Sequence, residues 1–256
     1  MIPLFHEKPC GLPFKEAFKR CSALRKYETL DNQIDLGNPK ALLLYNRLVL
    51  QDFMGIDFTI PSGYLIPAIC SRWEFVNWII RDKGPSKILE IGTGASAILA
   101  MMFAKVGCHV EATESDELAL ENALNNVKLN NLESQILLRK VKTNCILRHY
   151  YDSLVEFDAI VCNPPQYDQN FFFLHSSKKG FVGKEFELVG GQKGHEFIVR
   201  LLEEVKSFRN PPKVYFQLTF PKLNKSISNY LQKQDYLFRK VHRTVGTRQR
   251  YYYRVD

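Results

Sequence analysis

The chain from residue 87 onward alternates short apolar segments with longer amphipathic ones. Four segments have the length and apolar character of strands covered on both faces of a sheet: 87–92, 109–114, 136–141 and 157–162. Segments 96–107 and 116–131, which lie between them, have the spacing of apolar residues that is typical of helices. Because strands joined by helices pair in parallel, this alternation predicts an α/β fold with a parallel sheet.

The flanking segments predict further elements. We expect helices at 39–53, 64–82 and 194–208, and strands at 213–220, 236–244 and 248–255. The last two strands form a closing pair. About thirty residues after Pro165 lack clear periodicity, and loops of that length in a compact fold are usually functional or mobile. We divide the chain into an N-terminal arm with a helical segment, 1–83, and a main domain, 84–256.

Composition indicates a folded protein that suits an anionic partner. Of the 256 residues, 45% are hydrophobic and 24% are charged, which excludes a disordered chain, and the formal net charge is +8. The last 26 residues contain seven basic and two acidic side chains, a net charge of +5, and their arginines alternate with Tyr251, Tyr252 and Tyr253. Such a segment can bind phosphates and stack on bases, although an edge strand kept soluble by arginine has the same composition.

Cysteine spacing and the apolar runs indicate a reducing compartment and no membrane segment. The six cysteines are far apart and lack the paired spacings of zinc or redox sites, so we expect free thiols, no metal and a cytoplasmic location. Segment 1–10 has charges and prolines where a signal peptide needs an apolar core, and Arg47 interrupts the strongest apolar run, 41–50.

A glycine-rich turn lies between the first strand and the first helix of the alternation. In LEIGTGASA, residues 89–97, Gly92, Gly94 and Ala97 have the spacing of a dinucleotide-binding turn, and Glu114 ends the next strand, where a ribose-binding acid is expected. This pattern fits a nicotinamide cofactor, S-adenosylmethionine, or a tight turn without a ligand.

Glu90 favours S-adenosylmethionine among these three. It stands two residues before Gly92, where a pyrophosphate would rest on the helix N-terminus. A carboxylate roughly 5 Å from a phosphate costs about 3 kcal/mol at an effective dielectric constant of about 20, whereas it attracts the ammonium or sulfonium group of the methyl donor.

The segment VCNPPQYD, residues 161–168, places an asparagine and two prolines directly after the fourth predicted strand. Ligands of open parallel sheets bind at this carboxyl edge, so we expect Asn163 beside the glycine turn. Pro164 and Pro165 fix φ and have no N–H, which leaves two rigid acceptors, the Asn163 side-chain oxygen and the Pro164 carbonyl. Two acceptors that hold both N–H bonds of a planar amine can aim its lone pair at a donor methyl, so the segment predicts amine methylation by positioning.

Taken together, these motifs resemble one family. The chain contains, in order, IGTGAS, ATESD, NVKLNNL, CNPP, ELVGGQKGHEFIVRLL and VGTRQRYYYRV. This order is similar to class I S-adenosylmethionine-dependent methyltransferases, and among them to the RlmF and methyltransferase-like protein sixteen family of adenine-N6 RNA methyltransferases. The resemblance covers most of the chain from about Asn38.

The resemblance implies a Rossmann-like seven-stranded sheet, mostly parallel with an antiparallel C-terminal edge, and a small N-terminal helical extension that contacts RNA and covers the cofactor. It implies an enzyme that methylates the N6 amine of an adenine in structured RNA, and we expect a monomer. Arg72 would then bind the donor carboxylate, and the arginines of GTRQR would bind RNA.

The motifs and the resemblance together predict three sets of site residues. The residues expected to hold S-adenosylmethionine are Arg72, Glu90, Gly92, Gly94, Ser96, Glu114 and Asn163. The residues expected to hold and orient the target are Asn163, Pro164, Pro165, Gln166 and Tyr167. The residues expected to contact RNA are Lys178, Lys179, Arg243, Arg248 and Arg250.

Gln166 departs from the family, in which a phenylalanine after Asn-Pro-Pro stacks on the flipped adenine. An amide stacks less strongly than a ring, so Tyr167 or one of Phe171, Phe172 and Phe173 would have to supply that ring. A second departure is GGQKG, where the family tends to have Gly-Gly-Glu. Two alternatives therefore stay open: methylation of a glutamine side chain in a protein, and an inactive RNA-binding subunit that keeps the fold.

Overall fold

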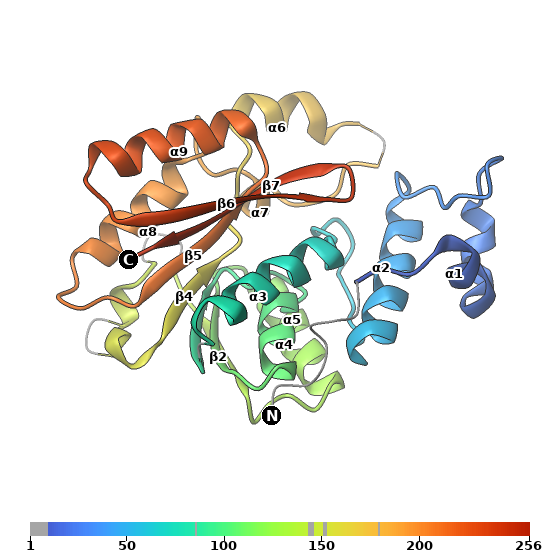
Figure 1. The fold of residues 1–256 in the computed structure, drawn as a ribbon. Coiled ribbons are helices and arrows are strands. Elements are labelled where there is room, and N and C mark those ends of the chain that lie inside the picture. The colour runs from blue at the N-terminus through green and yellow to red at the C-terminus, as the bar shows by residue number, and fades with distance from the viewer. Residues whose placement is uncertain (1–9, 85, 143–145, 151–152, 179) are drawn as a thin grey trace.

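The computed structural model describes residues 10–84, 86–142, 146–150, 153–178 and 180–256. Within these ranges the chain forms one seven-stranded sheet, with β1 Lys87–Ile91, β2 His109–Glu114, β3 Ile136–Lys140, β4 Ala159–Cys162, β5 Lys213–Leu218, β6 Phe238–Val245 and β7 Arg248–Val255. The strand order is β3-β2-β1-β4-β5-β7-β6. β7 is antiparallel to β5 and to β6, and all other neighbours are parallel (Figure 1). The predicted fold class, with its antiparallel C-terminal edge, is confirmed.

Helices cover both faces of the sheet (Figure 1). The α-helices are α1 Phe14–Arg20, α2 Pro39–Met54, α3 Ile69–Lys83, α4 Ile98–Lys105, α5 Glu117–Leu129, α6 Gln169–Ser176, α7 Glu185–Leu188, α8 Glu196–Lys206 and α9 Pro221–Lys233. The 3₁₀ helices are η2 Ser22–Tyr27, η3 Arg148–Tyr150 and η4 Leu154–Glu156. Ile88 of β1 packs in a core with α2, α3, α4 and α5, whereas its neighbour Leu89 packs in a second core with α8 and α9. This burial on both faces explains why the central strands are so apolar.

Two predicted segments differ from the structure. The long loop expected after Pro165 contains the helices α6 and α7. α6 begins after Asp168, whose carboxylate accepts a hydrogen bond from the Phe171 N–H at 2.7 Å and so replaces a missing helical partner. The helix expected at 64–82 begins only at Ile69, because Pro67 keeps the residue before it out of the helical region.

Helix α9 is absent from the sequence prediction. Its buried side chains include Leu223, Ile227 and Leu231, which recur every four residues, and Pro221 occupies its first turn. The other positions are mostly polar, so the periodic signal depends on these three residues alone.

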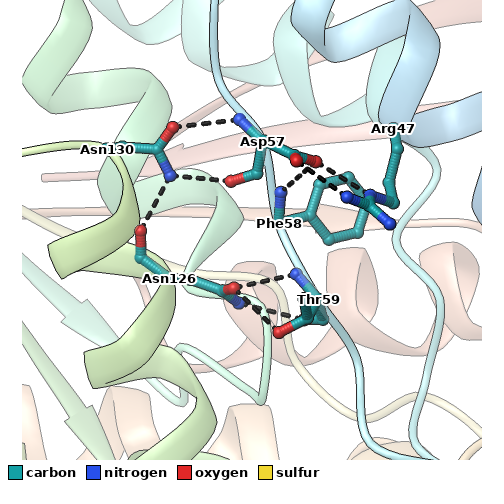
Figure 2. A network of polar contacts seen from close by, with 6 residues as sticks. All are labelled: Arg47, Asp57, Phe58, Thr59, Asn126 and Asn130. Atoms are coloured by element: carbon teal, nitrogen blue, oxygen red, sulfur yellow. Dashed lines mark hydrogen bonds and ion pairs between the residues drawn. The ribbon is translucent and has the colours of Figure 1, made fainter.

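Asparagine side chains of α5 hold the segment that connects α2 to α3 (Figure 2). The Asn130 amide accepts from the Asp57 N–H at 2.9 Å and donates to the Asp57 carbonyl at 2.7 Å. Asn126 is buried and makes the equivalent pair with Thr59, at 2.8 and 3.0 Å, while it also donates to the Ala95 carbonyl at 3.3 Å. The same side chain therefore fixes the connecting segment against the glycine turn.

The N-terminal helices share a core with the sheet. Phe18 of α1 and Leu50 of α2 belong to the hydrophobic cluster that contains Ile88. Nearby, the Arg47 guanidinium donates to both carboxylate oxygens of Asp57, at 2.8 and 2.7 Å, and lowers the pKa of that carboxyl (Figure 2). None of the helices in the described part of the chain has the length and apolar character needed to cross a membrane.

Candidate active site

The glycine turn and the Asn-Pro-Pro segment lie side by side at the carboxyl edge of the sheet. Ile91 of β1 pairs with Cys162 of β4, so Gly92 and Asn163 directly follow two neighbouring strands. Gly92 and Gly94 have φ angles of 71° and 67°, in the left-handed region that favours glycine. The tight turn that these two residues allow leaves room above the sheet edge for a ligand.

A cavity of about 150 Å³ opens at this edge, and we call it the donor cavity. All seven residues that the sequence assigns to the methyl donor line it: Arg72, Glu90, Gly92, Gly94, Ser96, Glu114 and Asn163. A smaller cavity of about 70 Å³ shares the wall at Gly92, Glu114 and Phe197, and Ile146 lines its far part. Residues from α3 and from the ends of three strands are thus brought to one site.

The Glu114 carboxylate is held in place by backbone N–H groups. One oxygen accepts from the Gly94 N–H at 2.8 Å, and the other accepts from the N–H groups of Ser115 and Asp116 at 2.6 and 2.9 Å. A carboxylate has about four lone-pair sites, and these N–H groups occupy three of them. One lone pair, on the oxygen bonded to Gly94, is left to accept a hydrogen bond from a ribose hydroxyl.

Glu90 is a buried carboxyl group in the wall of the donor cavity. Burial raises its pKa to about 7, although the Thr93 hydroxyl donates to it at 3.0 Å and Arg72 opposes the rise. A cationic ligand beside Glu90 would restore the ionised form, so the residue fits the ammonium or sulfonium group of S-adenosylmethionine.

Arg72 lines the donor cavity without a bound partner. No hydrogen bond or ion pair joins its guanidinium to another side chain in the ranges that the structure describes, while burial and the nearby Arg250 lower its pKa to about 10. A desolvated cation of this kind favours an anionic ligand, and a carboxylate matches the geometry of a guanidinium.

A second cavity, of about 410 Å³, adjoins the first, and we call it the acceptor cavity. It shares Leu65, Arg72, Asn163, Pro165 and Glu187 with the donor cavity. Its other wall residues include all the remaining ones that the sequence assigns to the target: Pro164, Gln166 and Tyr167. Asn163 therefore lies where the two cavities meet.

Gln217 of β5 orients the Asn163 side chain. Its Nε2 donates to the Asn163 Oδ1 at 2.8 Å, and the Gln217 side chain is buried. The Gln217 Oε1 has no hydrogen-bond partner among the described residues. Sequence reasoning missed this residue, although a polar side chain in the otherwise apolar strand segment VYFQL is a detectable signal.

Gln166 and Tyr167 have different places in the acceptor cavity. The Gln166 amide donates to the Gln217 carbonyl at 3.0 Å and accepts from the Thr219 N–H at 2.7 Å, so it connects the Asn-Pro-Pro segment to the end of β5. The Tyr167 ring packs against Phe171 and Phe220, with centroid distances of 4.7 and 5.5 Å. Tyr167, Phe171 and Phe220 all line the acceptor cavity, so it has an aromatic wall beside Gln166.

The glycines of GGQKG lie directly behind the Asn-Pro-Pro segment. A Cβ on Gly190 would be 2.5 Å from the Pro165 carbonyl oxygen, and one on Gly194 would be 2.7 Å from that of Gln166. Two chain segments can approach this closely only where the side chain is absent, so these glycines support the position of Asn163.

The residues expected to contact RNA differ in burial and in their relation to the acceptor cavity. Arg248 is exposed and lines the acceptor cavity, whereas Arg250 lines it but is buried, with its Nε donating to the Ser71 hydroxyl at 2.8 Å. Arg243 on β6, opposite Arg250, and Lys178 after α6 are exposed and line neither cavity. Lys179 lies outside the described residues. In the described parts of the chain, no three His, Cys, Asp or Glu side chains gather as metal ligands.

The sequence matches a family model described as RNA methyltransferase over residues 18–178. A protein of Methanocaldococcus jannaschii named as methyltransferase MJ0046 is 32% identical over 222 residues, which cover 83% of this chain and 84% of that protein. Ribosomal RNA large subunit methyltransferase F of Stutzerimonas stutzeri is 28% identical over an alignment that covers 59% of this chain and 52% of that protein. U6 small nuclear RNA (adenine-(43)-N(6))-methyltransferase of Schizosaccharomyces pombe is 28% identical over an alignment that covers 69% of this chain and 49% of that protein. The chain spans about half the length of the last two relatives.

Solved structures share the fold. The catalytic domain of human METTL16 in complex with MAT2A 3′UTR hairpin 1 superposes with a TM-score of 0.84 at 21% identity, and covers 95% of this chain and 90% of that one. The N-terminal domain of human METTL16 in complex with SAH gives a TM-score of 0.81 at 20% identity, and the superposition covers 100% of this chain and 98% of that one.

Proposed function

Because this chain belongs to the family of RNA methyltransferases whose model matches residues 18–178, we propose that it methylates the N6 amine of an adenine in structured RNA. Its donor is S-adenosylmethionine, which supplies an electrophilic methyl group on a sulfonium centre. The names of two relatives support the choice of target, since one modifies ribosomal RNA and one modifies an adenine of U6 RNA.

The observation that carries the proposal is the position of Asn163 between the donor and acceptor cavities. A group held by the Asn163 oxygen and the Pro164 carbonyl would lie next to the donor cavity. The exocyclic amine of adenine has a delocalised lone pair and two N–H bonds, so two fixed acceptors can orient it. No strong general base is needed, because the methylated amine becomes acidic and loses its proton late.

The walls of the donor cavity supply complementary charges. Glu90 would face the positive groups of the donor, Arg72 its carboxylate and Glu114 a hydroxyl group of its ribose. In the acceptor cavity, the Tyr167 ring would stack on the base, in the role that Gln166 cannot fill because its amide is bonded to β5.

The charge around the acceptor cavity fits a polyanionic substrate. Arg72, Arg248 and Arg250 line it, and Lys178 and Arg243 are exposed on neighbouring elements. We also propose a monomer. We propose a cytoplasmic location because the widely spaced cysteines indicate free thiols.

The test is to incubate the purified protein with labelled S-adenosylmethionine and total RNA, digest the RNA, and identify the labelled nucleoside by mass spectrometry. We expect N6-methyladenosine with the natural chain and at least about a hundredfold less with Asn163→Ala, because the amine loses one of its two fixed acceptors. Label in protein instead of RNA would select a glutamine methyltransferase. Bound donor without any transfer would indicate an inactive RNA-binding subunit.

A further inference from the structure

A third cavity, of about 660 Å³, adjoins the acceptor cavity, and we call it the flanking cavity. Four residues line both: Gln166, Tyr167, Phe171 and Phe220. None of its residues lines the donor cavity, so this space has no part in binding the methyl donor. Its position indicates a use on the side of the RNA substrate.

The wall shared by the two cavities is aromatic. The ring centroids of Tyr167, Phe171 and Phe220 are 4.7 to 5.9 Å apart, and all three rings are only partly buried. His175 stacks on Phe171 at 3.9 Å and supports it from α6. Partly exposed rings of this kind are the usual platforms for unpaired bases, because every base has a face that can stack.

The remaining lining of the flanking cavity is polar and basic. Lys193 and Lys222 are exposed on its rim, and neither ammonium group pairs with an acidic side chain in the described ranges. Asp168 is the acidic residue of the lining, and its carboxylate is bonded to the first turn of α6. Asn170 and Gln192 add exposed amides that can bond the edge of a base.

We propose that the flanking cavity binds the nucleotide next to the target adenine, with its base against the Phe171 and Phe220 rings of the aromatic wall and its phosphate beside Lys193 and Lys222. The proposal rests on the proposed function and adds a selection of sequence around the methylated position. When the target base lies in the acceptor cavity, a single phosphodiester links it to the next nucleotide of the strand. That nucleotide must therefore lie close to the wall that the two cavities share. The flanking cavity is the adjoining space with both a stacking surface and cations for the linking phosphate.

Two substitutions test this site from its own side. Ser226→Trp places a large ring in the cavity from α9, where Ser226 lines the flanking cavity only. Lys222→Ala removes one rim charge, and Lys225→Ala is its matched control, an exposed lysine of the same helix that lines none of the three cavities. Donor affinity by titration calorimetry reports folding and the donor cavity independently of RNA.

The substrate is an RNA pool with one adenine and randomised neighbours, and the methylated products are sequenced. The natural chain should prefer particular nucleotides on one side of the adenine. Ser226→Trp should abolish that preference and raise KM about tenfold, since the stacking of one base is lost. Lys222→Ala should reduce the slope of log affinity against log salt by about 0.7, the value for one phosphate of a single strand, whereas Lys225→Ala should leave it unchanged.

Several results would overturn the inference. One is an unchanged flanking preference in Ser226→Trp with normal donor affinity, and another is an equal salt slope for Lys222→Ala and Lys225→Ala. Methylation by the natural chain without any flanking preference would also reject the site while leaving the proposed function intact. Absence of methylation by the natural chain would instead reject the proposed function.

Discussion

At Asn163, the side-chain oxygen has two lone pairs, and Gln217 occupies one of them. The other stays available to an amine in the acceptor cavity. The cost of this arrangement lies in Gln217 itself, whose Oε1 is buried without a hydrogen-bond partner among the described residues. A buried polar atom of this kind lowers the free energy of unfolding by about 1–3 kcal/mol. Gln217 therefore orients Asn163 at the expense of the stability of the fold.

Gln217→Met should separate these two effects. Methionine has a similar volume, and its only hydrogen-bonding atom is a weakly accepting thioether sulfur, so the free energy of unfolding should stay equal or rise. Without the amide donor, Asn163 can rotate, and kcat should fall about tenfold to a hundredfold while donor affinity is unchanged. Urea unfolding, single-turnover rates and calorimetry measure the three quantities. A stable variant with full kcat would show that Gln217 does not orient Asn163.

Glu90 should make donor binding depend on pH. Its pKa of about 7 means that the negative charge facing the donor sulfonium develops as pH rises from about 6 to about 8. The dissociation constant of the donor should therefore decrease over that range, by up to about tenfold per pH unit. Glu90→Gln cannot ionise, so its affinity should be weaker at high pH and should lose this dependence. Calorimetry at several pH values measures the dissociation constant of the donor. The same pH dependence in the natural chain and in Glu90→Gln would contradict the contact between Glu90 and the donor.

At the scale of elements, α5 covers the sheet and also binds the segment that connects α2 to α3. Asn122 and Asn126 of α5 and its C-cap Asn130 recur every four positions, which places their amides on one helix face, toward the 57–59 segment. Asparagine is common at the end of a helix. Asn130 does stand at the helix end, but its amide also bonds Asp57, a partner that is distant in sequence.

Asn126→Ala should lower the free energy of unfolding by about 3 kcal/mol, because the Thr59 N–H and the carbonyls of Ala95 and Ser96 lose their buried partner. Donor affinity should also fall, since Ala95 and Ser96 belong to the glycine turn. Asn125→Ala is the control, an exposed asparagine one position away whose loss should cost under about 0.5 kcal/mol. Equal urea midpoints for the two variants would exclude the bridging role.

At the scale of the molecule, the basic C-terminal hairpin has two functions. Arg254 of β7 and Arg239 of β6 bond Asp82 of α3, which anchors one end of the hairpin. At the other end, Arg248 and Arg250 line the acceptor cavity. The net charge of +8 therefore overstates the cations that are free to bind RNA.

Arg248→Ala should weaken RNA binding and reduce its salt dependence by about one unit of slope, because one phosphate contact is lost. Arg250→Ala should instead destabilise the chain, since its guanidinium is buried against Ser71. Lys128→Ala on α5 is a control for the loss of one exposed charge. Titration of labelled RNA at several salt concentrations measures the slopes, and equal slopes for Arg248→Ala and Lys128→Ala would remove Arg248 from the RNA surface.

The sequence by itself determined the central strands, the glycine turn, and the order in which Glu90, Glu114 and Asn163 follow strand ends. These features depend on local periodicity and on backbone requirements of glycine and proline, which are readable from neighbouring residues. Only the tertiary structure decided that Gln217 orients Asn163 and that the Gln166 amide is hydrogen-bonded to the end of β5. It also decided that Arg250 is buried while Arg248 is exposed. Each of these depends on contacts between segments far apart in the chain, and a pattern of neighbouring residues carries no information about which distant groups will meet.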